Sequence, residues 1–424
     1  MDKRQLENII SDQREELDAK RHLRLIHRDE EDLIDFQSPQ AQVVIGVRRS
    51  GKSTLCYSAL MANHIKFAYF NLDDERLLKL NSNDLNDLLE ILYKVYGDFD
   101  CLFIDEIQNI PEWYLFVNRL LRRGMHILIT GSNAKLLSGE LATHLTGRHH
   151  TITLYPFSFK EYCLYKEIDV ESVSTKSVAA LRAAFDDYMM QGGFPELLSI
   201  RDKRGYIINL VDNIIKRDIF LRFKIKHKAT FEKLSHNLLN ESPCMVQYKN
   251  LKESFGIGSV HTVGNYVRFL MQAYLLIGLH RFSFKSRQRL TCDKAYPIDV
   301  ALMNNREDAF SGKNLGLRLE SIVYIDLLRR YKPLGYDIYF YNDRSFECDF
   351  LVCNGNVVKL AIQVSYDISN DKTYKREING LVKIAEKTKA QRLLLLTDHE
   401  YRDIEVAGFP ISIRPVYDFS LHPL

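Results

Sequence analysis

The chain has 424 residues, of which 46% are hydrophobic and 27% are charged, and its formal net charge is only +3. This length is enough for two to four domains with their own cores, and the composition is that of an ordinary soluble globular protein. This net charge is too small to indicate a nucleic-acid or membrane partner by itself. No apolar run approaches the roughly 20 residues that span a bilayer.

The cysteines and the first residues indicate the compartment. The seven cysteines are scattered, their count is odd and none forms a CxxC pair, which argues against a closed set of disulfides. The N-terminal stretch is charged and helical in pattern and lacks the apolar core of a signal peptide. We therefore expect a reduced, cytoplasmic protein without a membrane partner.

The first third of the chain alternates between strands and helices. An amphipathic helical stretch over residues 1–35 precedes apolar strands and helical segments that alternate from Gln42 to about Thr153. This alternation is typical of a mainly parallel sheet with helices on both faces, so we predict an α/β fold here.

A phosphate-binding loop follows the first strand. The segment GVRRSGKST fits the pattern G-x-x-x-x-G-K-[ST], in which glycines let backbone N–H groups surround phosphate oxygens. The lysine supplies a charge to the β and γ phosphates and the serine hydroxyl ligates Mg²⁺. The residues expected to contact the nucleotide are Gly46, Val47, Arg48, Arg49, Ser50, Gly51, Lys52, Ser53 and Thr54.

Two later strands end in polar residues that suit hydrolysis. CLFIDEIQ places Asp105 to hold Mg²⁺ through water and Glu106 to orient and deprotonate the attacking water. The next strand ends in Thr130, Ser132 and Asn133, where a polar group contacts the γ-phosphate and that water. No guanine-reading Asn-Lys-x-Asp motif is present, which favours ATP over GTP.

Arginines near these segments are candidates for stabilising transition-state charge. Arg148, one loop beyond the third strand, is expected as a finger in cis or from a neighbouring subunit of a homo-oligomer; the alternative is a surface arginine paired with an acid. Arg48, Arg49, Arg122 and Arg123 are weaker candidates.

Several short segments, taken in their order along the chain, resemble those of a known family, and the resemblance covers almost the whole chain. The segments are GVRRSGKST, LFIDEIQNIPEW, LYPFSFKEY, YMMQGGFPE, IIKRDI and YPIDVAL. The chain resembles the prokaryotic AAA-type ATPases that carry a C-terminal domain of unknown function (family 4143). The resemblance implies an ASCE-type P-loop parallel sheet, a helical lid, a winged helix and a nuclease-like fold. We expect an N-terminal helix plus P-loop ATPase domain at 1–157, a helical lid or linker at 158–215, a winged-helix domain at 216–305 and a nuclease-like α/β domain at 306–424.

The middle of the chain predicts a winged helix over residues 229–282. A basic wing would contact nucleic-acid phosphates through Arg281, Lys285, Arg287 and Arg289. The third helix is expected to expose His261, Thr262, Asn265, Tyr266 and Arg268, a modest set for reading bases. The alternatives are a protein-contact module and a solvated basic face.

The hairpin from Phe346 to Tyr366 resembles a PD-(D/E)xK nuclease site, which needs two acids, a Glu-x-Lys and a divalent metal. Glu320 and Asp349 match the acids, but Gln363 and Ser365 stand at the Glu and Lys positions. We therefore predict a degenerate nuclease-like domain. A lysine migrating from elsewhere is the alternative, with Lys359, Lys372 and Lys375 available.

These observations predict a Mg²⁺-dependent ATPase whose nucleotide state is coupled to the C-terminal winged-helix and nuclease-like module. An unknown protein partner is also expected. The alternatives are an ATP-regulated DNA-binding protein with slow turnover and an ATP-dependent nuclease.

Overall fold

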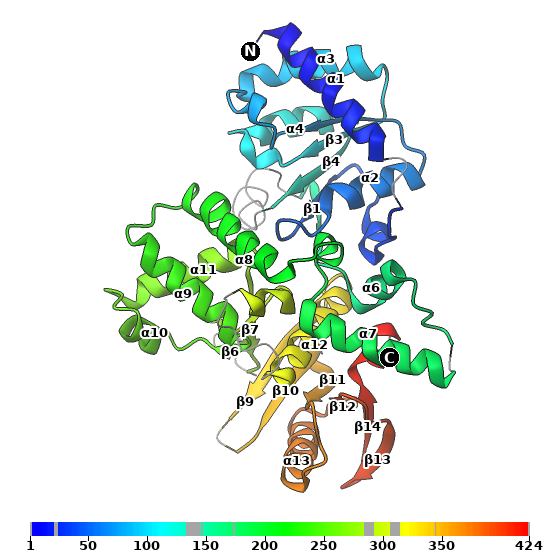
Figure 1. Ribbon diagram of the computed structural model, residues 1–424, viewed down its shortest axis with the longest axis vertical. Helices are drawn as coiled ribbons and strands as arrows, with labels where there is room; N and C mark the ends of the chain where they lie inside the picture. The colour runs from blue at the N-terminus through cyan, green and yellow to red at the C-terminus, as the bar shows by residue number, and fades with distance from the viewer. Residues whose placement is uncertain are drawn as a thin grey trace. The chain divides into compact units, whose positions relative to one another are not determined.

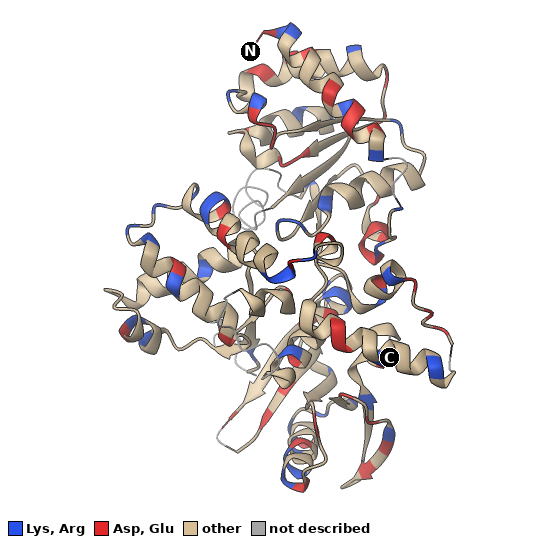
Figure 2. Cartoon of the chain, in the orientation of Figure 1, with Lys and Arg blue, Asp and Glu red and all other residues tan. Residues whose placement is uncertain are grey.

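The computed structural model describes residues 2–20, 24–132, 145, 147–172, 174–283, 292–305, 314–343 and 345–422. The chain divides into two compact units, Met1–Leu154 and Tyr155–Leu424. Figure 2 shows basic and acidic residues interspersed along the ribbon of both units, as the small net charge leads one to expect. Among the described residues, none of the helices combines the length and apolar character that crossing a membrane requires.

The first unit is built on a five-stranded parallel sheet with the strand order β2-β3-β4-β1-β5. Its strands are β1 (Ala41–Ile45), β2 (Phe67–Asn71), β3 (Cys101–Asp105), β4 (His126–Gly131) and β5 (His149–Thr153). All five residues of β1 and of β3 are buried, as expected for strands covered on both faces. The predicted parallel α/β sheet is therefore confirmed, with β4 lying between the strand of the phosphate loop and the strand of Asp105.

In the described part of this unit, four α-helices accompany the sheet (Figure 1). They are α1 (Lys3–Ala19), α2 (Lys52–Ala62), α3 (Leu85–Tyr96) and α4 (Trp113–Arg122). Apolar residues of α2, such as Leu55 and Cys56, share a buried core with Val44 of β1, Phe103 of β3 and Leu128 of β4. This packing fixes the start of α2 at the carboxyl ends of the strands, where ligands bind in open α/β sheets.

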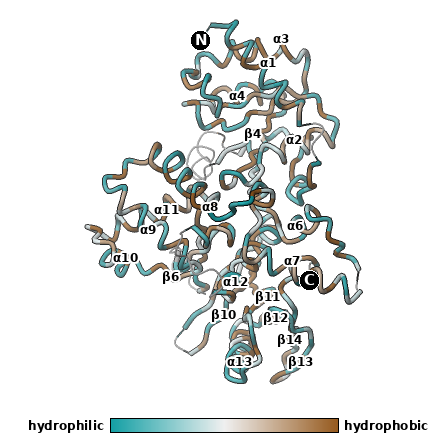
Figure 3. The backbone as a smooth tube through the Cα atoms, in the orientation of Figure 1, coloured by the Kyte–Doolittle hydropathy of each residue, from teal (hydrophilic) through white to brown (hydrophobic). Residues whose placement is uncertain are grey.

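The second unit begins with helices and ends in a nine-stranded sheet. The helices are α6 (Phe159–Lys166), α7 (Thr175–Gln191), α8 (Lys203–Asn213), a π-helical turn (Ile214–Phe220), α9 (Lys228–Glu241), α10 (Tyr248–Ser254), α11 (Val260–Gln272), α12 (Leu315–Tyr331), α13 (Asp371–Thr388) and α14 (Val416–Leu421). Along α13 the hydropathy changes repeatedly between hydrophilic and hydrophobic (Figure 3). Its buried residues, among them Ile378, Leu381 and Ala385, join the core beside the sheet.

The strand order of this sheet is β13-β14-β12-β11-β10-β9-β7-β8-β6. The strands are β6 (Cys244–Met245), β7 (Leu276–Arg281), β8 (Cys292–Pro297), β9 (Asp337–Asn342), β10 (Glu347–Asn354), β11 (Val357–Val364), β12 (Arg392–Thr397), β13 (Arg402–Val406) and β14 (Phe409–Pro415). Strand β7 pairs in parallel with β9, with His280 opposite Tyr339. The segments expected as separate domains at 216–305 and 306–424 therefore share one continuous sheet.

Two of the motifs that carried the resemblance meet inside this unit. Gly193 and Ala301 donate backbone hydrogen bonds of 2.9 and 2.8 Å to the carboxylate of Asp299. Gly192 has a φ of 77°, and a Cβ atom there would lie 1.9 Å from Asp299 Oδ1, so only glycine fits. Arg318 is buried and donates to the carbonyl of Val300 at 3.2 Å. QGGFPE and YPIDVAL thus form one buried junction.

Candidate nucleotide-binding site

The phosphate loop joins the buried strand β1 to the start of α2. Gly46 has a φ of 151°, and a Cβ atom there would lie 2.1 Å from the carbonyl oxygen of Leu154. Gly51, with a φ of 95°, precedes the first residue of α2. Both positions therefore require glycine. The first N–H groups of α2 have no intrahelical acceptors, and together with the helix dipole they form an anion-binding end.

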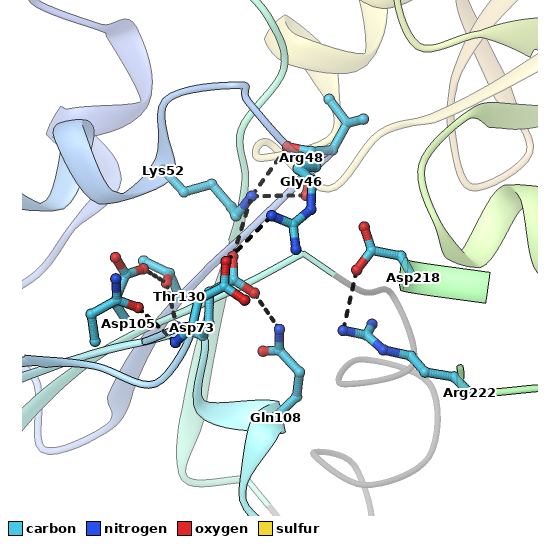
Figure 4. Close-up of polar contacts among 12 residues, drawn as sticks. Gly46, Arg48, Lys52, Asp73, Asp105, Gln108, Thr130, Asp218 and Arg222 are labelled. Carbon is cyan, nitrogen blue, oxygen red and sulfur yellow. Dashed lines mark hydrogen bonds and ion pairs between the residues drawn. The ribbon is translucent and has the colours of Figure 1, made fainter. Parts of the chain in front are cut away.

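Lys52 points back over this loop rather than into solvent. Its side chain is 5% exposed, and its ammonium donates to the carbonyls of Gly46 at 3.2 Å and Val47 at 3.1 Å (Figure 4). The same nitrogen lies 4.0 Å from Oε1 of Glu106. The charge that the sequence assigned to phosphate binding therefore sits above the loop and beside the proposed catalytic acid.

Asp105, the last residue of β3, lies at the centre of a hydroxyl cluster. The Thr130 hydroxyl donates to its Oδ1, the Tyr69 hydroxyl donates to its Oδ2 at 3.3 Å, and the Ser53 hydroxyl also bonds this side chain. Burial raises the pKa of Asp105, as does the neighbouring Glu106 charge, while the hydrogen bonds from Thr130 and Ser53 oppose that rise. The two predicted Mg²⁺ ligands, Ser53 and Asp105, are thus in contact.

Glu106 has a left-handed backbone with a φ of 54°, an uncommon conformation that aims its side chain at the phosphate loop. Its N–H donates to Thr130 Oγ1 at 3.1 Å, and the Gln108 amide donates to its carboxylate. Burial alone would raise its pKa, but the charge of Lys52 and the hydrogen bonds of Gln108 and Ser132 outweigh that effect and lower it. Glu106 is therefore held ionised, as a base for water must be.

The donor set fits Mg²⁺ with a nucleotide. Mg²⁺ is usually held by one or two protein carboxylates or hydroxyls together with phosphate oxygens and water, and the Ser53–Asp105 pair supplies one of each kind. Within the described part of the chain, the buried Ser50 hydroxyl in the loop has no hydrogen-bond partner, which leaves it available to a phosphate oxygen.

The predicted arginines Arg48 and Arg148 lie at opposite ends of the sheet. Arg48 lies at the site, where it pairs with Asp73 at 3.4 Å. Arg148 precedes β5, and its carbonyl accepts from the N–H of Ala41 at 2.9 Å, which places it at the amino end of the sheet. The phosphate loop lies at the opposite, carboxyl end, about five residues of strand away at roughly 3.3 Å each. Arg148 therefore does not reach the site of its own chain, and both the finger from a neighbouring subunit and the surface arginine paired with an acid stay as predictions.

The other arginines and one polar residue are also placed. Arg122 and Arg123 lie at the end of α4, before the amino end of β4, and Arg49 is an exposed residue of the loop itself. Ser132 is 1% exposed and hydrogen-bonds Glu106. Asn133 lies outside the described residues.

Sequence reasoning missed three contributors. Gln108 follows Glu106 by two residues and orients its carboxylate, so its polarity within IDEIQ was an available signal. Tyr69 reaches Asp105 from β2, and the buried Arg28 donates to the carbonyl of Ser50 at 3.3 Å. Neither of these two belongs to a local pattern, so no spacing rule identifies them.

One predicted residue of the nucleic-acid surface is misplaced. Tyr266 was expected on the exposed side of its helix, but it is 5% exposed and packs edge-on against Phe231 with ring centroids 5.0 Å apart. Its apolar ring therefore serves the core between α9 and α11. His261, Asn265 and Arg268 form a chain of hydrogen bonds along the helix surface. Arg281 ends β7, and Lys285, Arg287 and Arg289 lie outside the described residues.

Comparison with known families matches an AAA domain to residues 38–163 and a domain of unknown function (DUF8612) to residues 182–312. An uncharacterized protein of Methanocaldococcus jannaschii is 32% identical over 431 residues, which cover 98% of this chain and 95% of the relative. The chain belongs to the prokaryotic AAA-type P-loop family with a C-terminal domain of unknown function. This AAA-type protein is also 29% identical to an uncharacterized Haemophilus influenzae protein, over 92% of this chain and 96% of that one. The resemblance seen in the sequence is confirmed, although the C-terminal model that matches is numbered 8612 rather than 4143.

Two solved structures match this AAA-type protein over part of its length. A signal transduction ATPase with numerous domains from Pyrococcus horikoshii is 17% identical, with a TM-score of 0.27, and the match covers 72% of this chain and 46% of that one. The RuvB Holliday junction branch migration motor of Thermotoga maritima is 16% identical, with a TM-score of 0.28, over 56% and 82% of the two chains. At these scores we draw nothing further from either structure.

Proposed function

We propose that this AAA-type protein binds ATP with Mg²⁺ and hydrolyses it. The observation that carries the proposal is the joint placement of Lys52, Ser53, Asp105 and Glu106 at the carboxyl ends of β1 and β3. Lys52 would bind the β and γ phosphates, and Ser53 and Asp105 would hold the metal ion. Bound Mg²⁺ supplies positive charge that neutralises the phosphate oxygens during transfer.

Glu106 and its neighbours would accept the proton of the attacking water. An ionised Glu106 accepts the proton of a water molecule aligned with the γ-phosphate, and the Gln108 amide keeps the carboxylate oriented. Ser132, which hydrogen-bonds Glu106, lies where a polar group would contact the γ-phosphate. Thr130 holds the two acids in register, since its hydroxyl donates to Asp105 and accepts from the N–H of Glu106.

Phosphate release from ATP tests the proposal. Wild-type protein should release phosphate steadily with Mg²⁺ and should lose that activity when EDTA removes the metal. Ser53→Ala should abolish the Mg²⁺-dependent activity, whereas the exposed Lys66→Ala in the same unit should leave it intact. Wild-type release no faster than that of Ser53→Ala, with and without DNA or RNA, would show that the protein does not hydrolyse ATP.

We also propose that the nucleotide state is used by the C-terminal unit. The order α9, β6, α10, α11, β7, β8 is that of a winged helix, and β8 pairs in antiparallel fashion with both β6 and β7. The order α12, β9, β10, β11, α13, β12 is that of the nuclease-like core implied by the resemblance. A cytoplasmic setting and an as yet unidentified protein partner complete this proposal.

A second candidate is ATP-regulated nucleic-acid binding. A cavity of about 540 Å³ opens beside α11, and the exposed Lys224, Lys226 and His227 line it together with Asn265. Such cations bind phosphate backbones with an affinity that falls as salt rises. The double variant Lys224→Ala/Lys226→Ala should weaken DNA binding and flatten its salt dependence, whereas exposed Lys176→Ala should not. Binding that is absent, or insensitive to salt, would reject this candidate.

A further inference from the structure

A partly buried lysine meets the acids of the nuclease-like segment. Lys294, on β8, has a side chain that is 17% exposed, and its ammonium donates to Oε1 of Glu320 at 2.5 Å. The hydroxyl of Tyr296, two residues further along β8, donates to the same oxygen at 2.6 Å. Glu320 lies on α12 and its side chain is 11% exposed. The carboxylate that the sequence matched to a metal ligand is thus already engaged by a cation and a phenol.

Asp349 shares this environment from β10. Its Oδ2 accepts a hydrogen bond from the N–H of Val364 at 2.8 Å. Burial raises its pKa well above the ordinary value, as does the charge of Glu320, while Lys294 opposes that rise. Burial would lower the pKa of Lys294, but the charges of Glu320 and Asp349 outweigh it and raise that pKa. The ammonium therefore neutralises the Glu320 carboxylate by direct contact, and its charge also acts on Asp349.

Gln363 does not act as a ligand, because its amide braces the backbone. Its Oε1 accepts from the N–H of Asp349 at 2.8 Å, and its Nε2 donates to the carbonyl of Glu347 at 3.2 Å. These bonds hold a break in the pairing of β9 and β10, between Cys348 and Leu351. The break in pairing is a β-bulge, and the neutral amide at the expected glutamate position stabilises it. A carboxylate could not do so in the same way, because it has no proton to donate to the carbonyl of Glu347.

Ser365, which stands at the lysine position of the expected motif, also bonds to the backbone. Ser365 follows the end of β11, and its hydroxyl donates to the carbonyl of Asp367 at 3.2 Å. Lys375 pairs with Asp371 on the surface of α13, whereas Lys294, which the sequence did not suggest, contacts Glu320. Among the residues that the structure describes, no group of three His, Cys, Asp or Glu side chains is arranged to hold a metal ion. The donor set does not fit the divalent metal of a nuclease.

We propose that the ammonium of Lys294 takes the place of that divalent cation, so that its ion pair with Glu320 fastens β8 to α12, which packs against β10. Lys294 is on the hairpin strand of the winged-helix order, while Glu320 and Asp349 belong to the nuclease-like core. The two segments are therefore held together by charge as well as by the sheet. This inference does not depend on ATP hydrolysis.

The test asks whether a divalent cation replaces the lysine. All proteins carry Ser53→Ala and contain no nucleotide, which removes Mn²⁺ binding at the phosphate loop. Lys294→Met should lower the melting temperature by roughly 5–15 °C, because it leaves two partly buried carboxyl groups without a cation. Millimolar Mn²⁺ should recover part of that loss, and adding Asp349→Asn to Lys294→Met should abolish the recovery. Lys294→Arg keeps the charge and should show no stabilisation by Mn²⁺.

Counting bound Mn²⁺ by electron paramagnetic resonance keeps the proposal testable if Lys294→Met does not fold. The Lys294-containing protein and its Asp349→Asn variant should bind the same number of ions. A bound ion that disappears with Asp349→Asn while Lys294 is present would overturn the proposal, since the site would then accept metal beside the lysine. Mn²⁺ that leaves a folded Lys294→Met variant unchanged would overturn it as well.

Discussion

The ammonium of Lys52 lies 4.0 Å from Oε1 of Glu106. This distance links the phosphate-binding residue to the proposed base, because the lysine charge keeps the pKa of Glu106 low despite its burial. Under the proposed function, phosphate binding and water activation would therefore depend on the same cation.

Lys52→Ala should weaken binding of a fluorescent ATP analogue by roughly 10- to 100-fold, the size expected for a lost charge-assisted hydrogen bond. It should also raise the pKa of Glu106, because the charge that opposes burial is removed. Titration of the analogue into wild type, Lys52→Ala and the control Lys66→Ala measures the loss. Equal affinities of the three proteins for the analogue would show that Lys52 does not contribute to nucleotide binding.

Thr130→Val should destabilise the first unit by about 1–3 kcal/mol, because it leaves a buried acceptor of Asp105 and the N–H of Glu106 without their partner. Thr130→Ser keeps the hydroxyl and should retain most of the stability and turnover. Urea unfolding and phosphate release compare the three proteins. A valine variant as stable and active as the serine variant would contradict the bridging role.

Gln363→Glu should destabilise the second unit by about 1–3 kcal/mol, since a carboxylate cannot donate to the carbonyl of Glu347. The exposed Gln391→Glu is a matched control that changes the same chemistry on the surface. Thermal unfolding of both variants checks the difference. Equal melting temperatures would mean that the amide does not brace the strand.

Asp299 should make stability depend on pH. Burial raises its pKa from 3.8 to about 6, although the N–H groups of Ala301 and Gly193 oppose that rise. The folded protein therefore binds more protons than the unfolded chain between these values, and stability from this group falls as pH rises from about 4 to about 6. The change is about 3 kcal/mol, at 1.36 kcal/mol for each pKa unit.

Unfolding free energies of wild type and Asp299→Asn, measured between pH 4 and pH 7, should show this slope only in wild type. Asparagine does not titrate, so the unfolding free energy of wild type should fall toward that of Asp299→Asn as pH rises. A constant difference across the range would show that Asp299 titrates near its ordinary value.

The parallel sheet and the place of the phosphate loop could be predicted from the sequence because both follow from local patterns. The residues from Gly46 to Thr54 are consecutive, and Asp105 and Glu106 lie at the end of one buried strand, so spacing alone predicted that they gather at one edge of the sheet. Arg148 failed as a finger within its own chain because strand direction, rather than its distance along the chain, decides which end of the sheet it occupies.

The C-terminal unit shows where such reasoning stops. Gln363 looked like a damaged ligand, but its amide satisfies two backbone groups that only the folded bulge brings together. Lys294 lies 26 positions before Glu320, and no motif joins them. Tyr266 was assigned to the surface from helical spacing, whereas packing against Phe231 buries it.

The most direct test of the central proposal separates ATP binding from ATP hydrolysis in Glu106→Gln. This variant keeps Lys52, Ser53 and Asp105 but cannot accept a proton from water. Nucleotide affinity and phosphate release should be measured on the same preparation. The account predicts affinity close to wild type and turnover reduced by roughly 100-fold or more. Turnover equal to wild type, or turnover lost only together with binding, would contradict the assignment of Glu106 as the base.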